Sequence, residues 1–215
     1  MKKQRSRQNE AELRNAVVSA VKSLYDRGLN STLSGNVSAR LDGNKMLLTP
    51  TGSTGILKGD LKPDQLSVVT FDGKLVGGPK QSSEWRVHAK IYKALPRVNA
   101  IVHPHPIESL LAVRRQGTHI IHNSFVEFGE ARYYLGVEKA PYIGVVRGKS
   151  GSEELAAAVL EQILKKKVSV VVMEWHGTVA IGANMAEALG RAEQLEYFAT
   201  FANRLSGKAD ARKGE

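Results

Sequence analysis

The chain has 215 residues, of which 42% are hydrophobic and 24% charged, with 20 glycines, 7 prolines and no cysteine. This composition excludes a largely disordered chain, a disulfide scaffold and a thiolate metal site, and apolar runs such as Val170–Met173 are too short to span a membrane. The formal net charge is +10, but Lys2, Lys3, Arg5 and Arg7 carry four of these charges. The weaker positive field of the body suits anionic small molecules better than nucleic acid.

We expect one globular domain over residues 9–206, between a flexible basic arm at 1–8 and a flexible tail at 207–215. The arm begins like a signal peptide, but Glu10, Glu12 and Arg14 stand where an apolar segment would be required. A cytoplasmic location is therefore expected, with no membrane partner.

The first half of the chain is predicted to form one helix followed by β-hairpins. Apolar residues recur every three or four positions from Asn9 to Arg27, which predicts an amphipathic helix closed by Gly28. Alternating segments separated by Asp-Gly turns then predict strands. These strands are Asn36–Leu41, Lys45–Thr49, Leu66–Thr70 and Lys74–Val76, and the stretch 50–63 is expected to be loop with at most a short helix.

The second half mixes helices with short apolar strands. We predict helices from a cap at Ser82 or Ser83 to about Leu95, over Ile107–Gln116, over Ser152–Lys166 with a cap at Ser150 or Ser152, and over Met185–Leu205. Strands are predicted at Ala100–His103, Val168–Met173 and Val179–Ile181, with a short one possible at Ile120–Ile121. Because most strands come as hairpins, the predicted fold is a three-layer α/β/α arrangement with a mostly antiparallel central sheet.

The segment His103-Pro104-His105-Pro106 ends the strand Ala100–His103. Residues two apart on a strand point to the same side, so the two imidazoles can converge on one point if the chain stays extended. The prolines lack N–H donors and belong at a strand end or edge. An isolated pair of this kind is more often two surface histidines at a turn.

A third imidazole, His176, also follows a buried strand, Val168–Met173. If the two strand ends meet, three imidazoles could hold a divalent ion and leave a position open for substrate. Taken alone, His176 would be a hairpin histidine bonded to the backbone. The other histidines lack such a context and are predicted to be structural; they are His88, His119 and His122.

Glu84 follows Ser82 and Ser83 at a predicted helix start. A helix start with hydroxyl groups suits an anion, and an acidic residue there could simply stabilise the helix dipole. Beside a metal, however, the carboxylate could transfer a proton.

Two polar loops, at 34–38 and 49–53, combine glycine with hydroxyl and amide donors that suit phosphate oxygens. Neither matches a Walker or dinucleotide-binding fingerprint. By itself each loop would be an ordinary turn.

Together these segments resemble the class II aldolase/adducin family, and most closely its L-fuculose-1-phosphate aldolase type. Five motifs in the same order carry the resemblance, which extends from about Leu13 to about Leu205: SGNVS at 34–38, TPTGS at 49–53, SSE at 82–84, HPHP at 103–106 and WHG at 175–177. The resemblance implies a central antiparallel sheet covered by helices. It also implies a homotetramer with active sites between subunits.

The resemblance further implies a metal-dependent lyase. Its metal ligands would be His103, His105 and His176, binding Zn²⁺ or another divalent ion such as Mn²⁺, Co²⁺ or Fe²⁺, and Glu84 would be the acid/base. The substrate phosphate would be held by Gly35, Asn36, Thr51, Gly52, Ser82 and Ser83. Cleavage of a small ketose phosphate would give dihydroxyacetone phosphate and an aldehyde through a metal-stabilised enediolate.

The chain also departs from the family pattern. Asn123 stands where the aldolases place a tyrosine that assists proton transfer, and neither Tyr133, Tyr134 nor Tyr142 can be assigned that role. The 4-epimerases of this scaffold typically carry lysine at the position of Thr49 and aspartate at that of Glu84, which disfavours an epimerase. Metal-dependent decarboxylases and dehydratases of sugar phosphates stay open, as does an adducin-like binding module, although such modules lack the three histidines.

Overall fold

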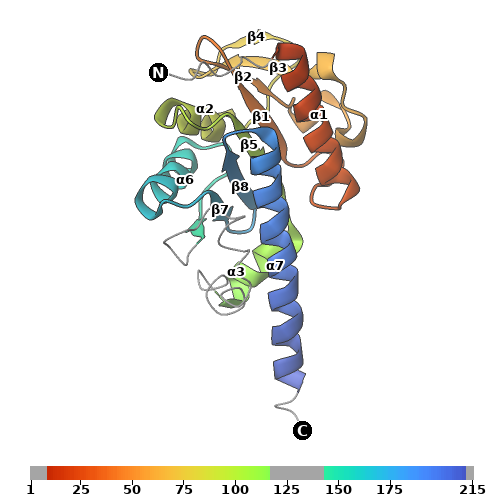
Figure 1. Cartoon of the computed structure of the whole chain (residues 1–215), viewed down its shortest axis with the longest axis vertical. Helices are drawn as coiled ribbons and strands as arrows, with labels where there is room; N and C mark the ends of the chain where they lie inside the picture. The colour runs from red at the N-terminus through yellow and green to blue at the C-terminus, as the bar shows by residue number, and fades with distance from the viewer. Residues whose placement is uncertain (1–8, 117–142, 212–215) are drawn as a thin grey trace, which may run out of the picture.

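The computed structural model describes residues 9–116 and 143–211 of the chain (Figure 1), with side chains over 9–114 and 143–204. The described helices are α1 (Glu10–Asp26), α2 (Trp85–Ala94), α3 (Ile107–Gln116), α6 (Glu153–Lys166) and α7 (Met185–Ala211). The described strands are β1 (Asn36–Leu41), β2 (Lys45–Leu48), β3 (Ser67–Thr70), β4 (Leu75–Gly77), β5 (Ala100–His103), β6 (Gly144–Val146), β7 (Val170–Met173) and β8 (Gly177–Gly182).

The described strands form one sheet of eight, in the order β4-β3-β2-β1-β5-β8-β7-β6. Neighbouring strands are antiparallel except β6 and β7, which are parallel. The predicted α/β class and mostly antiparallel sheet are thus confirmed. The parallel pair was not predicted, because β6 lies in a glycine-punctuated stretch that gave no clear strand signal.

Two apolar clusters lie on the two faces of this sheet. Along β7, Val170 and Val172 join one cluster, while Val171 and Met173 join the other, as the alternation of side chains along a strand requires. Buried residues of α1, α3 and α7 belong to the first cluster, and those of α2 and α6 to the second. Figure 1 shows α1 and α7 together in front of the sheet, with α2 and α6 beside each other at its other side.

Several element boundaries differ from those predicted. Helix α2 begins at Trp85 with Glu84 as its N-cap residue, later than the predicted cap at Ser82 or Ser83. The cap of α6 is Ser152, whose side chain accepts a hydrogen bond from the Leu155 N–H. Helix α7 continues beyond the predicted end at Leu205 and extends away from the body in Figure 1. The predicted loop 50–63 contains two short 3₁₀ turns, Gly52–Thr54 and Lys58–Asp60, and a third begins at its end, Pro63–Gln65.

Some predictions concern residues outside the described ranges. These are the basic arm 1–8, the last part of the tail, the strand Ile120–Ile121, the histidines His119 and His122, and the positions Asn123, Tyr133, Tyr134 and Tyr142. Among the described helices, none is long and apolar enough to cross a membrane.

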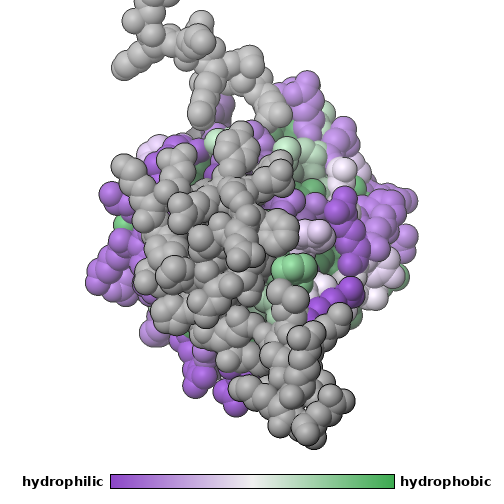
Figure 2. Space-filling view, turned by 60° about the horizontal axis from the view of Figure 1, so that its bottom comes forward, coloured by the Kyte–Doolittle hydropathy of each residue, from purple (hydrophilic) through white to green (hydrophobic). Residues whose placement is uncertain are grey.

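Helices α3 and α7, which reach the lower end of the molecule in Figure 1, carry exposed apolar side chains. They belong to α3, with Ile107 and Leu111, and to α7, with Tyr197 and Phe201. This end comes forward in Figure 2, and the coloured part of that face shows apolar atoms (green) bordered by polar ones (purple). Exposed apolar side chains that join into one area are typical of surfaces that contact another molecule.

Candidate metal and phosphate site

The order of strands places two distant strand ends side by side. Strand β5 pairs antiparallel with β8, so the end of β5 meets the start of β8. The Thr178 N–H donates to the carbonyl of Pro104 at 3.0 Å, just beyond the last residue of β5. His103 at the end of β5 and His176 just before β8 therefore lie close together, which is the condition for the shared site proposed from the sequence.

The three imidazoles that the sequence proposed as ligands form one compact group. His103, His105 and His176 each offer a ring nitrogen, and these nitrogens all lie within 4.8 Å of one another. Their ring centroids are 4.9, 4.9 and 5.0 Å apart. His103 is buried, and the other two rings are partly exposed. The group therefore has one enclosed side and one side open to a ligand.

The hydrogen bonds of this group fit a divalent metal. The Nδ1 of His103 lies 2.7 Å from the Thr178 carbonyl oxygen, which can only accept, so Nδ1 carries a proton and Nε2 is left to bind. The Nε2 atoms of His103 and His105 are 3.1 Å apart. Nitrogen ligands on a tetrahedral zinc stand about 3.3 Å apart, given bonds of about 2.05 Å. The spacing of this pair is thus close to that of two ligands on one ion, and the nitrogens of all three rings lie within 4.8 Å of one another.

Gly177 leaves no room for a side chain behind this group. A Cβ at Gly177 would lie 2.4 Å from the Pro104 carbonyl oxygen, 2.8 Å from His103 Cε1 and 2.9 Å from His105 Cδ2. We expect the Gly177→Ala variant to displace both rings and to lose about 2 kcal/mol of unfolding free energy, typical of overpacking. Urea denaturation and metal analysis by mass spectrometry check this prediction.

Gly190 in α7 provides the matched control. A Cβ there would meet no atom within 4 Å, so Gly190→Ala should stabilise the helix by up to about 1 kcal/mol and leave metal content unchanged. Equal metal content in the two variants would contradict the role of Gly177.

Glu84 faces the imidazole group from the start of α2. Its Oε2 lies 2.7 Å from His103 Nε2 and 3.3 Å from His176 Nε2. Its Oε1 accepts hydrogen bonds from the Ser150 hydroxyl at 2.9 Å and the Gly151 N–H at 3.0 Å. One carboxylate oxygen is therefore fixed by the turn before α6, and the other is presented to the site.

The surroundings keep Glu84 ionised and His105 neutral. Burial alone would raise the pKa of the Glu84 carboxyl. When no ion is bound at Nε2, His103 and His176 can donate hydrogen bonds to this carboxyl and carry positive charge, and together these effects outweigh burial and hold the Glu84 pKa well below its usual range. Burial, assisted by the charges of His103 and His176, lowers the pKa of His105 to about 3. A neutral imidazole is the form that binds metal.

The three segments predicted to bind phosphate also meet. Thr49 connects them, because its N–H donates to the Val37 carbonyl, its hydroxyl accepts from the Val37 N–H, and its carbonyl accepts from the Ser82 N–H. Asn36 pairs with His103 across β1 and β5, so this junction adjoins the imidazole group. Of the predicted phosphate ligands, Asn36 and Ser82 are buried, Ser83 is exposed, and Gly35, Thr51 and Gly52 are partly exposed.

Gly35 has a structural role that the sequence did not reveal. Its φ is +70°, and a Cβ would lie 2.4 Å from the Asn30 side-chain oxygen. That oxygen accepts a hydrogen bond from the His105 N–H at 3.0 Å. Gly35 therefore makes room for the residue that anchors the backbone of His105.

A buried lysine lies beneath the loop of Thr51 and Gly52. Lys58 is 2% exposed, and its ammonium donates to the Pro50 carbonyl at 3.0 Å. No carboxylate in the described ranges forms an ion pair with it. Burial lowers the pKa of Lys58 to about 8. The sequence gave no signal for this residue, because burial of a lysine depends on the packing of distant segments.

Lys58 should make stability depend on pH. Because its pKa is lower in the folded than in the unfolded chain, the unfolded chain binds more protons between about pH 8 and pH 10.5, and stability rises with pH in this range. We expect a gain of about 2 kcal/mol in unfolding free energy from pH 7.5 to pH 9.5. Urea denaturation at both pH values tests this.

Two variants isolate the contribution of this one lysine. Lys58→Met should remove the rise with pH, whereas Lys74→Met, at an exposed position, should retain it. A rise that persists in Lys58→Met would assign the effect to another group.

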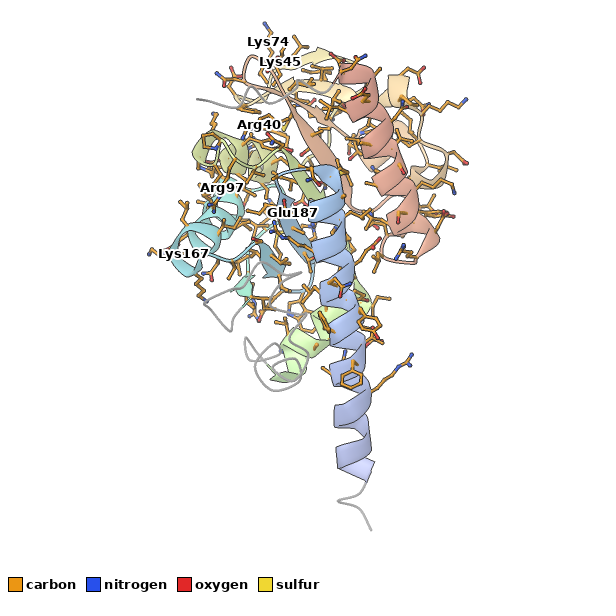
Figure 3. The ribbon with its side chains drawn as sticks, in the orientation of Figure 1. Arg40, Lys45, Lys74, Arg97, Lys167 and Glu187 are labelled. Carbon is orange, nitrogen blue, oxygen red and sulfur yellow. The ribbon has the colours of Figure 1, made fainter. Side chains whose placement is uncertain are left out.

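The labelled basic side chains in Figure 3 come from separate parts of the fold. Lys45 and Lys74 lie at the upper end beside the β-hairpins, and Lys167 lies at the end of α6. This arrangement agrees with a distributed positive charge.

Comparisons with known proteins match most of the chain. The family model of the class II aldolase and adducin N-terminal domain matches residues 15–202. The 3-oxo-tetronate 4-phosphate decarboxylase of Haemophilus influenzae is 33% identical over 187 residues, 87% of this chain and 85% of that protein. The L-fuculose phosphate aldolase of the same organism is 31% identical over 196 residues, 90% and 83% of the two chains.

A solved structure shows the same fold. The crystal structure of YgbL from Klebsiella pneumoniae, described as a candidate aldolase/epimerase/decarboxylase, superimposes with a TM-score of 0.80 and 28% identity, covering 93% of this chain and 92% of that one.

Proposed function

Since the chain belongs to the class II aldolase and adducin family, as its five motifs predicted, we propose that it is a metal-dependent carbon–carbon lyase acting on a small ketose phosphate, of the L-fuculose-1-phosphate type. The observation that carries this proposal is the group of three imidazole nitrogens within 4.8 Å of one another, with the Glu84 carboxylate 2.7 Å from one of them. A purely adducin-like binding module would not require such a group.

In the proposed site, His103, His105 and His176 hold a divalent ion, and Glu84 is the acid/base. The ion, when bound, supplies Lewis-acid chemistry by withdrawing electrons from the substrate carbonyl oxygen. In the cleavage direction the C3–C4 bond breaks, its electron pair remains on the fragment with the carbonyl, and the C4 hydroxyl gives its proton to the Glu84 carboxylate as the aldehyde forms. Glu84, now protonated and held in place by Ser150 and Gly151, delivers that proton to C3 and returns to its ionised state.

The substrate phosphate is assigned to the junction of the three loops. Donors there come from Asn36, Thr51 and Ser83, with the backbone of Gly35 and Gly52 and the hydroxyl of Ser82 beside them. Neutral donors of this kind are suited to a phosphate group at fixed distance from the reacting carbons.

Purified protein with one equivalent of zinc should release dihydroxyacetone phosphate from at least one member of a panel of ketose 1-phosphates, and a chelator should abolish the release. The coupled assay with glycerol-3-phosphate dehydrogenase measures this product. Metal-loaded protein that cleaves none of the panel would remove the aldolase proposal.

A decarboxylase is the second proposal, because one relative acts on 3-oxo-tetronate 4-phosphate. Loss of carbon dioxide from a β-keto acid also breaks a carbon–carbon bond and leaves the electron pair beside a carbonyl, so the same site could serve. Release of carbon dioxide from a 3-oxo acid phosphate, with no cleavage of ketose phosphates, would favour this reaction. Loss of water from a methylthioribulose phosphate would instead indicate a dehydratase.

We also propose that the chain assembles as a homotetramer. The exposed apolar side chains of α3 and α7 support an assembly, because a contact with another subunit would remove them from water. Light scattering coupled to size-exclusion chromatography over a range of micromolar concentrations tests this, and a monomer at all of them would contradict it.

A further inference from the structure

A row of four buried polar side chains connects helix α2 to the proposed phosphate site. The Tyr92 hydroxyl lies 2.8 Å from the Ser38 hydroxyl, which lies 2.6 Å from His88 Nδ1. On the other side of the ring, His88 Nε2 lies 2.5 Å from the Asn36 side-chain oxygen. Tyr92, Ser38, His88 and Asn36 are at most 5% exposed.

Local geometry brings these four residues into one row. Asn36 and Ser38 are two apart on β1 and point to the same side, about 6.6 Å from each other along the strand. His88 and Tyr92 are four apart on α2 and lie on one face, about 6 Å apart along the axis. Because the two spacings nearly match, each helix residue can meet a strand residue.

The buried phenol fixes the direction of the hydrogen bonds. Ser38 is the hydrogen-bond partner of the Tyr92 hydroxyl among the described residues, so the phenolic proton must be donated to Ser38 or remain buried without an acceptor. Ser38 then donates to His88 Nδ1, and the proton of the ring is on Nε2, which donates to the Asn36 oxygen. Burial lowers the pKa of His88 to about 3, which is consistent with a neutral ring.

This direction determines how the Asn36 amide is oriented. Its oxygen is turned towards His88, so its NH₂ group points away from the row. No described residue accepts a hydrogen bond from this nitrogen, which stands at the junction of the three loops beside His103. An ionised phosphate oxygen accepts but cannot donate, so it can be bound by the amide in this orientation and not in the flipped one.

We propose that His88, with Ser38 and Tyr92 behind it, is a positioning residue that holds the Asn36 amide with its donor side towards the substrate phosphate. This inference rests on the proposed phosphate site and extends it to a histidine that the sequence assigned a structural role. His88 acts through Asn36 and does not itself touch the substrate.

The first test determines, in wild-type protein, which ring nitrogen of His88 carries the proton and therefore in which direction the hydrogen bonds of the row run. Long-range ¹H–¹⁵N spectra of protein labelled with ¹⁵N-histidine should show His88 neutral at pH 7 with its proton on Nε2, assigned by the loss of the signal in His88→Gln. A proton on Nδ1, or a charged ring, would overturn the inference. The protonation of the ring is read in wild-type protein, and the His88→Gln variant serves only to assign the signal.

The second test uses two matched substitutions and inorganic phosphate as the probe. The amide of His88→Gln reaches the position of Nε2 and can still donate to Asn36, whereas the shorter His88→Asn can reach only Ser38. By calorimetry, we expect His88→Asn to bind phosphate at least tenfold more weakly than wild type, and His88→Gln within threefold of it. For an active substrate, His88→Asn should raise KM with kcat changed less than threefold.

Equal phosphate binding by wild type and a folded His88→Asn would overturn the inference. If phosphate binding depends on His88 but the protein shows no lyase activity, the role of His88 is supported and the proposed reaction is removed. The inference and the proposed function can therefore fail separately.

Discussion

The His103→Ala variant is expected to lose its bound metal and to be at least 10³-fold slower than wild type. His103 is the most enclosed of the three imidazoles, and its Nδ1 bond to Thr178 fixes the nitrogen that faces the site. Two remaining ligands hold a divalent ion weakly, and 10³-fold corresponds to roughly 4 kcal/mol of lost transition-state stabilisation. Metal analysis and initial rates of the best substrate measure both effects.

The melting temperature of the variant is measured as well, because His103 is buried and its removal leaves a cavity that lowers stability. The variant should remain folded at the assay temperature, and excess zinc should restore no more than a small part of the activity. Unchanged metal content in His103→Ala would contradict the proposed ligand set and favour a binding module.

The Glu84→Gln variant is expected to keep its metal and lose between about 10²- and 10⁴-fold in rate, the range for loss of a general acid/base. The amide has the shape of the carboxylate and can still accept from Ser150 and Gly151 through its oxygen, but it cannot take up a proton at neutral pH. Steady-state kinetics on metal-loaded protein give this ratio.

Glu161→Gln is the matched control, since Glu161 forms an exposed i, i+4 ion pair with Lys165 on α6. It should be as active as wild type. A Glu84→Gln protein that has lost its metal would assign Glu84 to metal binding, and a fully active one would remove it from the mechanism.

The sequence by itself determined the features that depend on neighbours a few residues apart. The three- and four-residue spacing of Leu13, Val17, Val21 and Leu24 predicted α1, and the Asp-Gly turns predicted the hairpins. The spacing of His103 and His105 predicted that their rings converge, and their Nε2 atoms lie 3.1 Å apart. The order of the five motifs predicted the family.

Only the tertiary structure decided which distant segments meet. The pairing of β5 with β8 brings His176 to His103, and the turn before α6 fixes Glu84 from 66 and 67 residues away in the chain. Burial of Lys58, and the row from Tyr92 to Asn36, likewise depend on the packing of a helix or loop against a strand. Local periodicity indicates which face of an element is apolar, but not which other element will cover that face. The contacts between elements that are distant in the sequence determine the charge states and the side-chain orientations of the site.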